Sequence, residues 1–147
     1  MQLKGLTIYL VSCVSRKRAL TSAARDLYIS DLFRKARAYA EASRCRWFIL
    51  SAEHGLVAPD QEIGPYEKTL NMMRIADRRA WSEQVAAQLD AVAPELSQVV
   101  FLAGQRYREF LAVHFANRGV AVSIPMEGKR IGEQLQWLGH NSPPEMK

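Results

Sequence analysis

Four short apolar runs, separated by segments of helical pattern, constrain the fold more than any other feature of this chain. They span residues 6–11, 47–50, 99–102 and 120–124. Within each run the apolar residues are continuous rather than alternating with polar ones, which is typical of strands covered on both faces. Strands that alternate with helices predict an α/β fold: a single three-layer domain with a mainly parallel sheet of about four strands flanked by helices.

Four further segments carry apolar residues at helical spacing and are predicted to be helices: residues 30–43, 77–92, 104–119 and 129–138. Ser30 and Asp77 are the expected N-caps of the first two helices, because their side-chain oxygens accept hydrogen bonds from a first turn. Gly119 is expected to end the third helix. The adjacent Arg78 and Arg79 are expected to lie on a solvated helix face.

The length of 147 residues and the hydrophobic content of 48% suit one domain with a real core. We expect this domain to span residues 1–139 and a flexible tail to span residues 140–147. No apolar run reaches the roughly 18 residues that a transmembrane helix needs, so we expect no membrane partner and a cytoplasmic protein. The two cysteines and three histidines lack metal-ligand spacing, and no metal or other cofactor is predicted. The oligomeric state is left open.

The chain is basic, with a formal net charge of +5 and a pI near 9.5, and arginine makes up most of its 20 basic residues. The arginine guanidinium binds phosphate as a planar fork and stacks on bases. A nucleic-acid or nucleotide partner is therefore expected. Charge alone does not separate such a protein from a basic domain that binds no nucleic acid.

Polar or glycine-bearing segments follow all four predicted strands: residues 12–17, 51–56, 103–107 and 125–134. Ligands of parallel α/β sheets bind beyond the carboxyl ends of the strands, which lie at one edge. The sequence therefore predicts a ligand site where these four segments meet.

Two of these segments are predicted to bind phosphate. Cys13, Ser15 and Lys17 follow the first strand, where small hydroxyls and cations suit an anion; a solvated basic loop is the alternative. The Cys13 thiol is either activated by the neighbouring cations or buried and inert. After the fourth strand, Gly128 is predicted to form a glycine-rich lip over a ligand, and Lys129 and Arg130 beside it are predicted to bind phosphate.

The catalytic candidates lie after the second strand. His54 suits general acid or base catalysis near neutral pH; alternatively, its imidazole hydrogen-bonds the backbone of its loop. The Asp60 carboxylate suits activation of water; alternatively, it is a solvated surface acid. Tyr66 either stacks on a base or pins its loop as a core aromatic. The remaining predicted substrate-binding residues lie at the ends of the second and third strands: Ser51, Gly55, Gly104 and Tyr107.

The segment "SAEHGLVAPDQEIGPY", residues 51–66, resembles the signature of the YaaA-like peroxide-stress protein family and its shorter relatives. In that signature the strand ends in Ser. A Tyr or His follows, with Gly and Leu directly after it, and a Pro-Tyr pair comes after a fixed interval. The matching residues here are Ser51, His54, Gly55, Leu56, Pro65 and Tyr66. Residues 26–33, 101–107 and 125–138 are also similar to the shorter relatives.

The resemblance implies DNA binding and protection of DNA from oxidative damage, which favours DNA over RNA as the partner. It also implies a fold similar to uracil-DNA glycosylases, which act on a flipped base. Three functions follow as expectations. The first is a DNA glycosylase-like enzyme that hydrolyses the N-glycosidic bond of a damaged or modified base. The second is a non-catalytic DNA-binding protein of stress response, DNA repair or phage defence, and the third is a small-nucleotide-binding enzyme.

Overall fold

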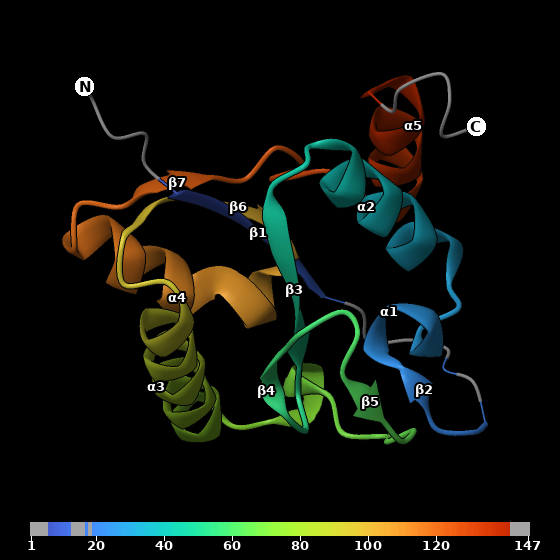
Figure 1. The fold of residues 1–147 in the computed structure, drawn as a ribbon, viewed down its shortest axis with the longest axis horizontal. Coiled ribbons are helices and arrows are strands. Elements are labelled where there is room, and N and C mark those ends of the chain that lie inside the picture. The colour runs from blue at the N-terminus through green and yellow to red at the C-terminus, as the bar shows by residue number, and fades with distance from the viewer. Residues whose placement is uncertain (1–5, 13–16, 18, 142–147) are drawn as a thin grey trace.

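The computed structural model describes residues 6–12, 17 and 19–141, which form an α/β fold in three layers (Figure 1). The elements follow in chain order: β1 (Leu6–Ser12), β2 (Ser22–Ala23), α1 (Ala24–Leu27), α2 (Asp31–Ala42), β3 (Arg46–Ser51), β4 (Gly55–Val57), β5 (Glu62–Ile63), the 3₁₀ helix η1 (Leu70–Met72), α3 (Ile75–Val92), β6 (Leu96–Leu102), α4 (Gln105–Asn117), β7 (Ala121–Ser123) and α5 (Ile131–Asn141).

The central sheet has five strands in the order β4-β3-β1-β6-β7. β3, β1, β6 and β7 run parallel, and β4 pairs antiparallel with β3 at one edge. The four parallel strands coincide with the four apolar runs, so the predicted mainly parallel sheet is confirmed. A separate two-stranded sheet pairs β2 with β5.

The sheet is covered on both faces, which explains why its strands are continuously apolar. Leu10 of β1 packs toward the layer of α3 and α4, whereas the next residue, Val11, packs toward the layer of α2 and α5. Phe48 and Ile49 of β3 divide between the two layers in the same way. Because successive strand residues point to opposite faces, a sheet with helices on both sides needs apolar residues at every position.

The helix ends agree with the sequence at two of the three expected positions. The Ser30 hydroxyl accepts the backbone N–H of Phe33 at 3.2 Å and caps α2. Gly119 follows α4 with a φ of +79°, as a C-terminal glycine does. The expectation for Asp77 is wrong: α3 begins two residues earlier, Arg74 is its N-cap, and Asp77 lies in the first turn.

Three further details differ from the sequence-based expectations. The strand β4 was not expected; it follows β3 through a tight hairpin in which Ser51 pairs with Gly55. Helix α5 continues through Asn141, so it includes the first two residues of the expected tail. Arg78 is buried rather than solvated.

Within the described part of the chain, no helix combines the length and apolarity needed to cross a bilayer.

Candidate functional site

The carboxyl ends of the four parallel strands lie on the same side of the sheet. The direction in which strands are added reverses between β1 and β6. The chain leaves β1 toward one side to form β3, then returns to form β6 on the other side of β1. In doubly wound sheets, ligands bind in the crevice outside the carboxyl ends at this reversal. The ends of β1 at Ser12 and of β6 at Leu102 are therefore where a ligand is expected.

A cavity of about 420 Å³ lies at this position, and we call it the switch-point cavity. Its volume falls in the range of roughly 300–1,000 Å³ that small-molecule sites occupy. Apolar side chains form its walls, including Phe33, Leu102, Met126 and Leu135. Its polar lining comes from segments far apart in the chain: Ser12, Ser30, Asp31, Asn71, Tyr107 and Gln134.

Several of these polar groups are held in place by hydrogen bonds. The Ser12 hydroxyl accepts the Gly104 N–H at 3.3 Å and so joins the ends of β1 and β6. Ser30 caps α2, and Asp31 is the exposed first residue of that helix. Among the described residues, no Lys or Arg lies within ion-pair distance of the Asp31 carboxylate. The buried Tyr107 hydroxyl lies 3.4 Å from the Leu70 nitrogen.

A smaller cavity of about 290 Å³ adjoins the first, and we call it the annex. Both cavities are lined by Ala103, Gly104, Met126 and Gln134. The annex is cationic because Arg108 and Lys129 line it, together with Gly128, whose φ is +80°. The Arg108 Nε donates to the Ala103 carbonyl at 3.2 Å, which holds the guanidinium at the end of β6.

Tyr66 belongs to an aromatic cluster with Tyr28, His54 and Lys17. Its hydroxyl lies 2.5 Å from the Tyr28 hydroxyl, and the His54 ring stands edge-on to it with centroids 5.7 Å apart. The Lys17 ammonium lies 4.4 Å from the Tyr66 ring centroid. Tyr66 also packs against both cores of the sheet. Through these contacts, Tyr66 holds its loop against the rest of the domain.

Ser51 and Gly55 build the β3–β4 hairpin. Ser51 is fully buried; its hydroxyl accepts the His54 N–H at 3.0 Å, and its carbonyl accepts the Trp81 indole N–H at 2.9 Å. Gly55 has a φ of +76°, which side-chain-bearing residues rarely adopt. The first part of the segment that resembles the YaaA-like signature, residues 51–57, thus belongs to a hairpin anchored on α3.

The other predicted site residues divide into four groups. Gly104, Tyr107 and Gly128 line the two connected cavities. His54 and Asp60 line neither cavity; Asp60 is exposed in the turn before β5. Cys13 and Ser15 lie outside the described residues. Arg130 is exposed, and its N–H donates to the Glu133 carboxylate at 2.8 Å at the start of α5.

The sequence analysis did not single out Asp31, Asn71 or Arg108. Asp31 directly follows an N-cap, and acids are so common there that its position carries no functional signal. Arg108 is one arginine among several on a helix. Lys129 was predicted, with Arg130, as a cation for phosphate; Lys129 lines the annex, whereas Arg130 does not.

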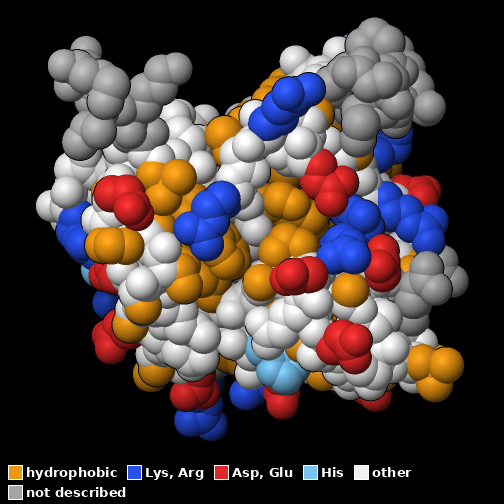
Figure 2. All heavy atoms as spheres, viewed as in Figure 1, with side chains coloured by type: hydrophobic (Ala, Val, Ile, Leu, Met, Phe, Trp, Pro, Cys, Tyr) orange, Lys and Arg blue, Asp and Glu red, His pale blue; other side chains and the backbone are white. Residues whose placement is uncertain are grey.

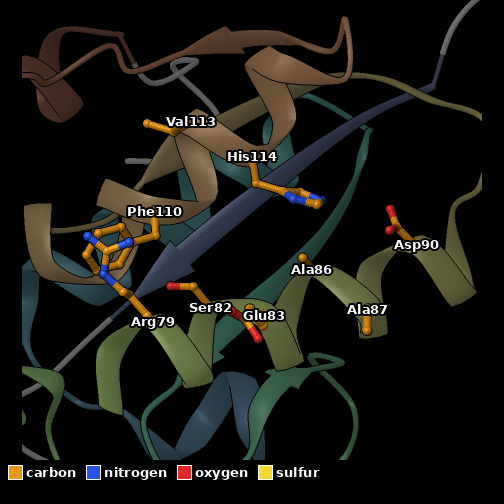
Figure 3. A pocket seen from close by; sticks show the side chains of 9 residues that line it. All are labelled: Arg79, Ser82, Glu83, Ala86, Ala87, Asp90, Phe110, Val113 and His114. Atoms are coloured by element: carbon orange, nitrogen blue, oxygen red, sulfur yellow. The ribbon is translucent and has the colours of Figure 1, made fainter. Parts of the chain in front are cut away.

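A third hollow, of about 630 Å³, lies between α3 and α4, away from the strand ends (Figure 3). The Arg79 guanidinium stacks there on the Phe110 ring, 4.6 Å from its centroid. Asp90 at the other end pairs with Arg118. Arg79 and Asp90 therefore have partners within the protein, and the groove lies away from the strand ends, where ligands of parallel α/β sheets bind.

Within the described part of the chain, no three His, Cys, Asp or Glu side chains gather into a group that could hold a metal ion. The two cavities at the strand ends carry charge of both signs among their described lining residues: Arg108 and Lys129 in the annex, and the Asp31 carboxylate in the switch-point cavity. This arrangement suits an organic ligand with an anionic substituent.

Comparison with known proteins gives a family. No solved structure matches the chain significantly. The Uncharacterized protein YfjM of Bacillus subtilis (strain 168) is 30% identical over an alignment of 123 residues, and the match covers 78% of this chain and 77% of that protein. A model described as "Family of unknown function (DUF6884)" matches residues 8–140. The chain therefore belongs to the DUF6884 family.

Proposed function

We propose that this protein holds a nucleoside unit, either free or extruded from DNA, in the switch-point cavity and hydrolyses its N-glycosidic bond. One observation carries the proposal. The cavity at the strand-order reversal combines apolar walls with a ring of hydrogen-bonding groups and a single carboxylate, Asp31, among its described lining residues. Bases are flat and apolar on their faces and polar at their edges, so this lining is complementary to them.

The lining groups divide the work of recognition. Phe33, Leu102 and Met126 offer apolar surface to the faces of a base. The Asn71 and Gln134 amides each supply both donors and an acceptor, which suit a base edge or sugar hydroxyls. This division resembles small-molecule sites in general, where a few polar groups orient a ligand inside apolar walls.

Asp31 supplies the chemistry in this proposal. Hydrolysis adds the oxygen of water to C1′ of the sugar and breaks the C1′–N bond, whose electron pair leaves with the base. The transition state resembles an oxocarbenium ion, which a nearby carboxylate stabilises. Asp31 accepts the proton of the attacking water and later releases it to solvent, and the departing base takes up a proton from solvent.

The test measures base release by chromatography. Nucleosides, nucleoside monophosphates and DNA carrying normal, oxidised, uracil or hypermodified bases are incubated with the protein. We expect release from at least one substrate and a loss of roughly 10²-fold or more in Asp31→Asn. Asp77→Asn is the matched control, because Asp77 is also an exposed acid in the first turn of a helix but lines neither cavity.

Release that survives Asp31→Asn would sink the assignment of Asp31. His54→Ala and Asp60→Asn variants test the two catalytic residues predicted from the sequence. If these variants no longer release the base and Asp31→Asn still does, the catalytic residues lie beside the aromatic cluster and not in the switch-point cavity. No release from any substrate would remove the enzyme function altogether.

A non-catalytic DNA-binding function is the second candidate, favoured by the net charge of +5. It predicts binding to duplex DNA that weakens steeply with salt. On the face seen in Figure 2, however, acidic and basic side chains are interspersed. Arg37, Arg78 and Arg118 also form ion pairs with acids of the protein itself. Salt-insensitive or absent duplex binding would dismiss this candidate.

A further inference from the structure

We propose that the annex binds the phosphate of a nucleoside monophosphate, so that the substrate is a free mononucleotide rather than a residue of DNA. This inference rests on the proposed function, because it assigns the base and sugar to the switch-point cavity. It adds the chemical class of the substrate and two residues that recognise it, Arg108 and Lys129.

The two cavities are close enough to share one ligand. Ala103, Gly104, Met126 and Gln134 line both of them. Gly104 lies on their common border, and a β-carbon added there would meet no atom within 4 Å. A ligand whose apolar part fills the first cavity can therefore extend a substituent into the second.

The cations of the annex are short of counter-ions. Lys129 is half-buried, and no carboxylate among the described residues lies within ion-pair distance of its ammonium. Arg108 is 15% exposed at its side chain, and its nearest carboxylate, that of Glu127, is 4.0 Å away and 67% exposed. Taking cations out of water without full compensation is unfavourable, and an anionic ligand offsets this cost.

Phosphate suits this pair of cations better than a carboxylate does. A phosphate monoester carries close to two negative charges near neutral pH and accepts several hydrogen bonds. The annex presents one planar guanidinium and one ammonium, which together balance that charge. Gln105, the first residue of α4, also lines the annex, and the first-turn N–H groups of a helix add favourable partial charge for an anion.

The distribution of charge separates a mononucleotide from DNA. A residue within a strand carries phosphates on both sides, and both need favourable surroundings. Among the described lining residues of the two cavities, the cations lie in the annex, and the switch-point cavity has no Lys or Arg and one carboxylate, Asp31. A second phosphate near Asp31 would be repelled. One phosphate, at one end of the ligand, fits this arrangement.

The experiment measures binding of defined probes by calorimetry. The probes are ribose 5-phosphate, the common nucleosides, their 5′- and 3′-monophosphates and a short single-stranded oligonucleotide. We expect at least one monophosphate to bind about tenfold or more tightly than its nucleoside. Lys129→Gln should reduce that preference about tenfold, whereas Glu127→Gln should increase it because the carboxylate no longer competes for Arg108.

Lys35→Gln is the matched control, because Lys35 is exposed on α2 and lines neither cavity. This variant should keep the preference of the natural protein. Equal binding of nucleosides and monophosphates would overturn the phosphate assignment and leave the proposed function standing. Binding of ribose 5-phosphate without binding of any nucleoside or nucleotide would overturn the proposed function and, with it, the mononucleotide. Tight oligonucleotide binding without monophosphate binding would overturn the mononucleotide in favour of DNA.

Discussion

Gly55 is the residue whose backbone conformation the β3–β4 hairpin depends on most directly. Its φ is +76°, and an added β-carbon would lie 2.4 Å from the Gln88 Oε1 and 2.9 Å from the Gln84 Nε2. The same Gln88 oxygen accepts the Leu56 N–H at 2.9 Å. A side chain at Gly55 would therefore strain the backbone and displace the glutamine that ties β4 to α3.

We expect Gly55→Ala to lower the free energy of unfolding by about 1–3 kcal/mol, measured by urea denaturation. The matched control is Gly139→Ala in α5, where an added β-carbon meets nothing within 4 Å. This second change should be neutral or stabilise by up to about 1 kcal/mol, because alanine favours a helix. Equal effects of the two changes would contradict the reason given for Gly55.

Arg78 shows how a charged residue can be structural. Its Nε lies 3.1 Å from a carboxylate oxygen of Glu109, and its Nη1 donates to the Met73 carbonyl at 2.7 Å. Arg78→Ala should cost about 2–3 kcal/mol of unfolding free energy, since it leaves both acceptors without this partner. The exposed Arg106 on α4 is the control, and Arg106→Ala should change stability by less than about 0.5 kcal/mol. Similar losses for both arginines would argue against this account.

Tyr9 gives the fold a dependence on alkaline pH. Burial, with the neighbouring Tyr39 and Cys45, raises the pKa of Tyr9 above its usual 10.0, although a hydrogen bond with Ser43 opposes the rise. The unfolded chain loses this proton first, so the contribution to stability is complete below pH 10 and is lost as pH rises through the folded pKa. As pH rises from 9 to 11, the free energy of unfolding, measured by urea denaturation, should fall less for Tyr9→Phe than for the natural protein. An identical fall with pH in the two proteins would contradict this.

At the scale of elements, helix α2 links stability to the proposed site. Its N-cap, Ser30, accepts the Phe33 N–H, and its first residue, Asp31, is the proposed catalytic carboxylate. We expect Ser30→Ala to cost about 1 kcal/mol of unfolding free energy and to lower base release, because an uncapped first turn frays. Ser30→Thr keeps a capping hydroxyl and should restore most of both. Normal release in Ser30→Ala would separate the cap from the site.

The β3–β4 hairpin shows why short elements escape sequence patterns. β4 is only three residues long, Gly55–Val57, and it directly follows a Glu-His pair. So short a segment shows no period, and glycine together with charged neighbours indicates a loop. Pairing with β3 and packing against α3 make it a strand, and neither partner is visible locally.

At the scale of the molecule, the two helix layers depend on one shared sheet. Leu10 faces the layer of α3 and α4, and Ile49 faces the layer of α2 and α5; both are fully buried. We expect Leu10→Ala and Ile49→Ala each to cost about 2–5 kcal/mol and to raise amide hydrogen exchange in both layers. Faster exchange confined to the layer nearest the mutation would indicate two independently unfolding units instead.

Most of the fold could be predicted because its signals are local. The four apolar runs became the four parallel strands, and each helical pattern became a helix within a few residues of its expected bounds. The polar lining of the strand-end cavities was predicted less well. The two cavities lie at the carboxyl ends of the strands, and Gly104, Tyr107 and Gly128 line them, but Asp31 and Arg108 come from helices that gave no sign of a ligand.

The sequence by itself determined the elements, their order and the burial of the sheet on both faces, because periodicity and capping depend on neighbours along the chain. Only the tertiary structure decided which polar side chains meet. Hydrophobic patterning records that a strand face is buried but not which strand lies beside it, so the same pattern suits several strand orders. The order that places β1 beside β6 creates the cavity beyond the carboxyl ends of these two strands. It also brings Ser12, Asp31 and Gln134 to one site from distant parts of the chain.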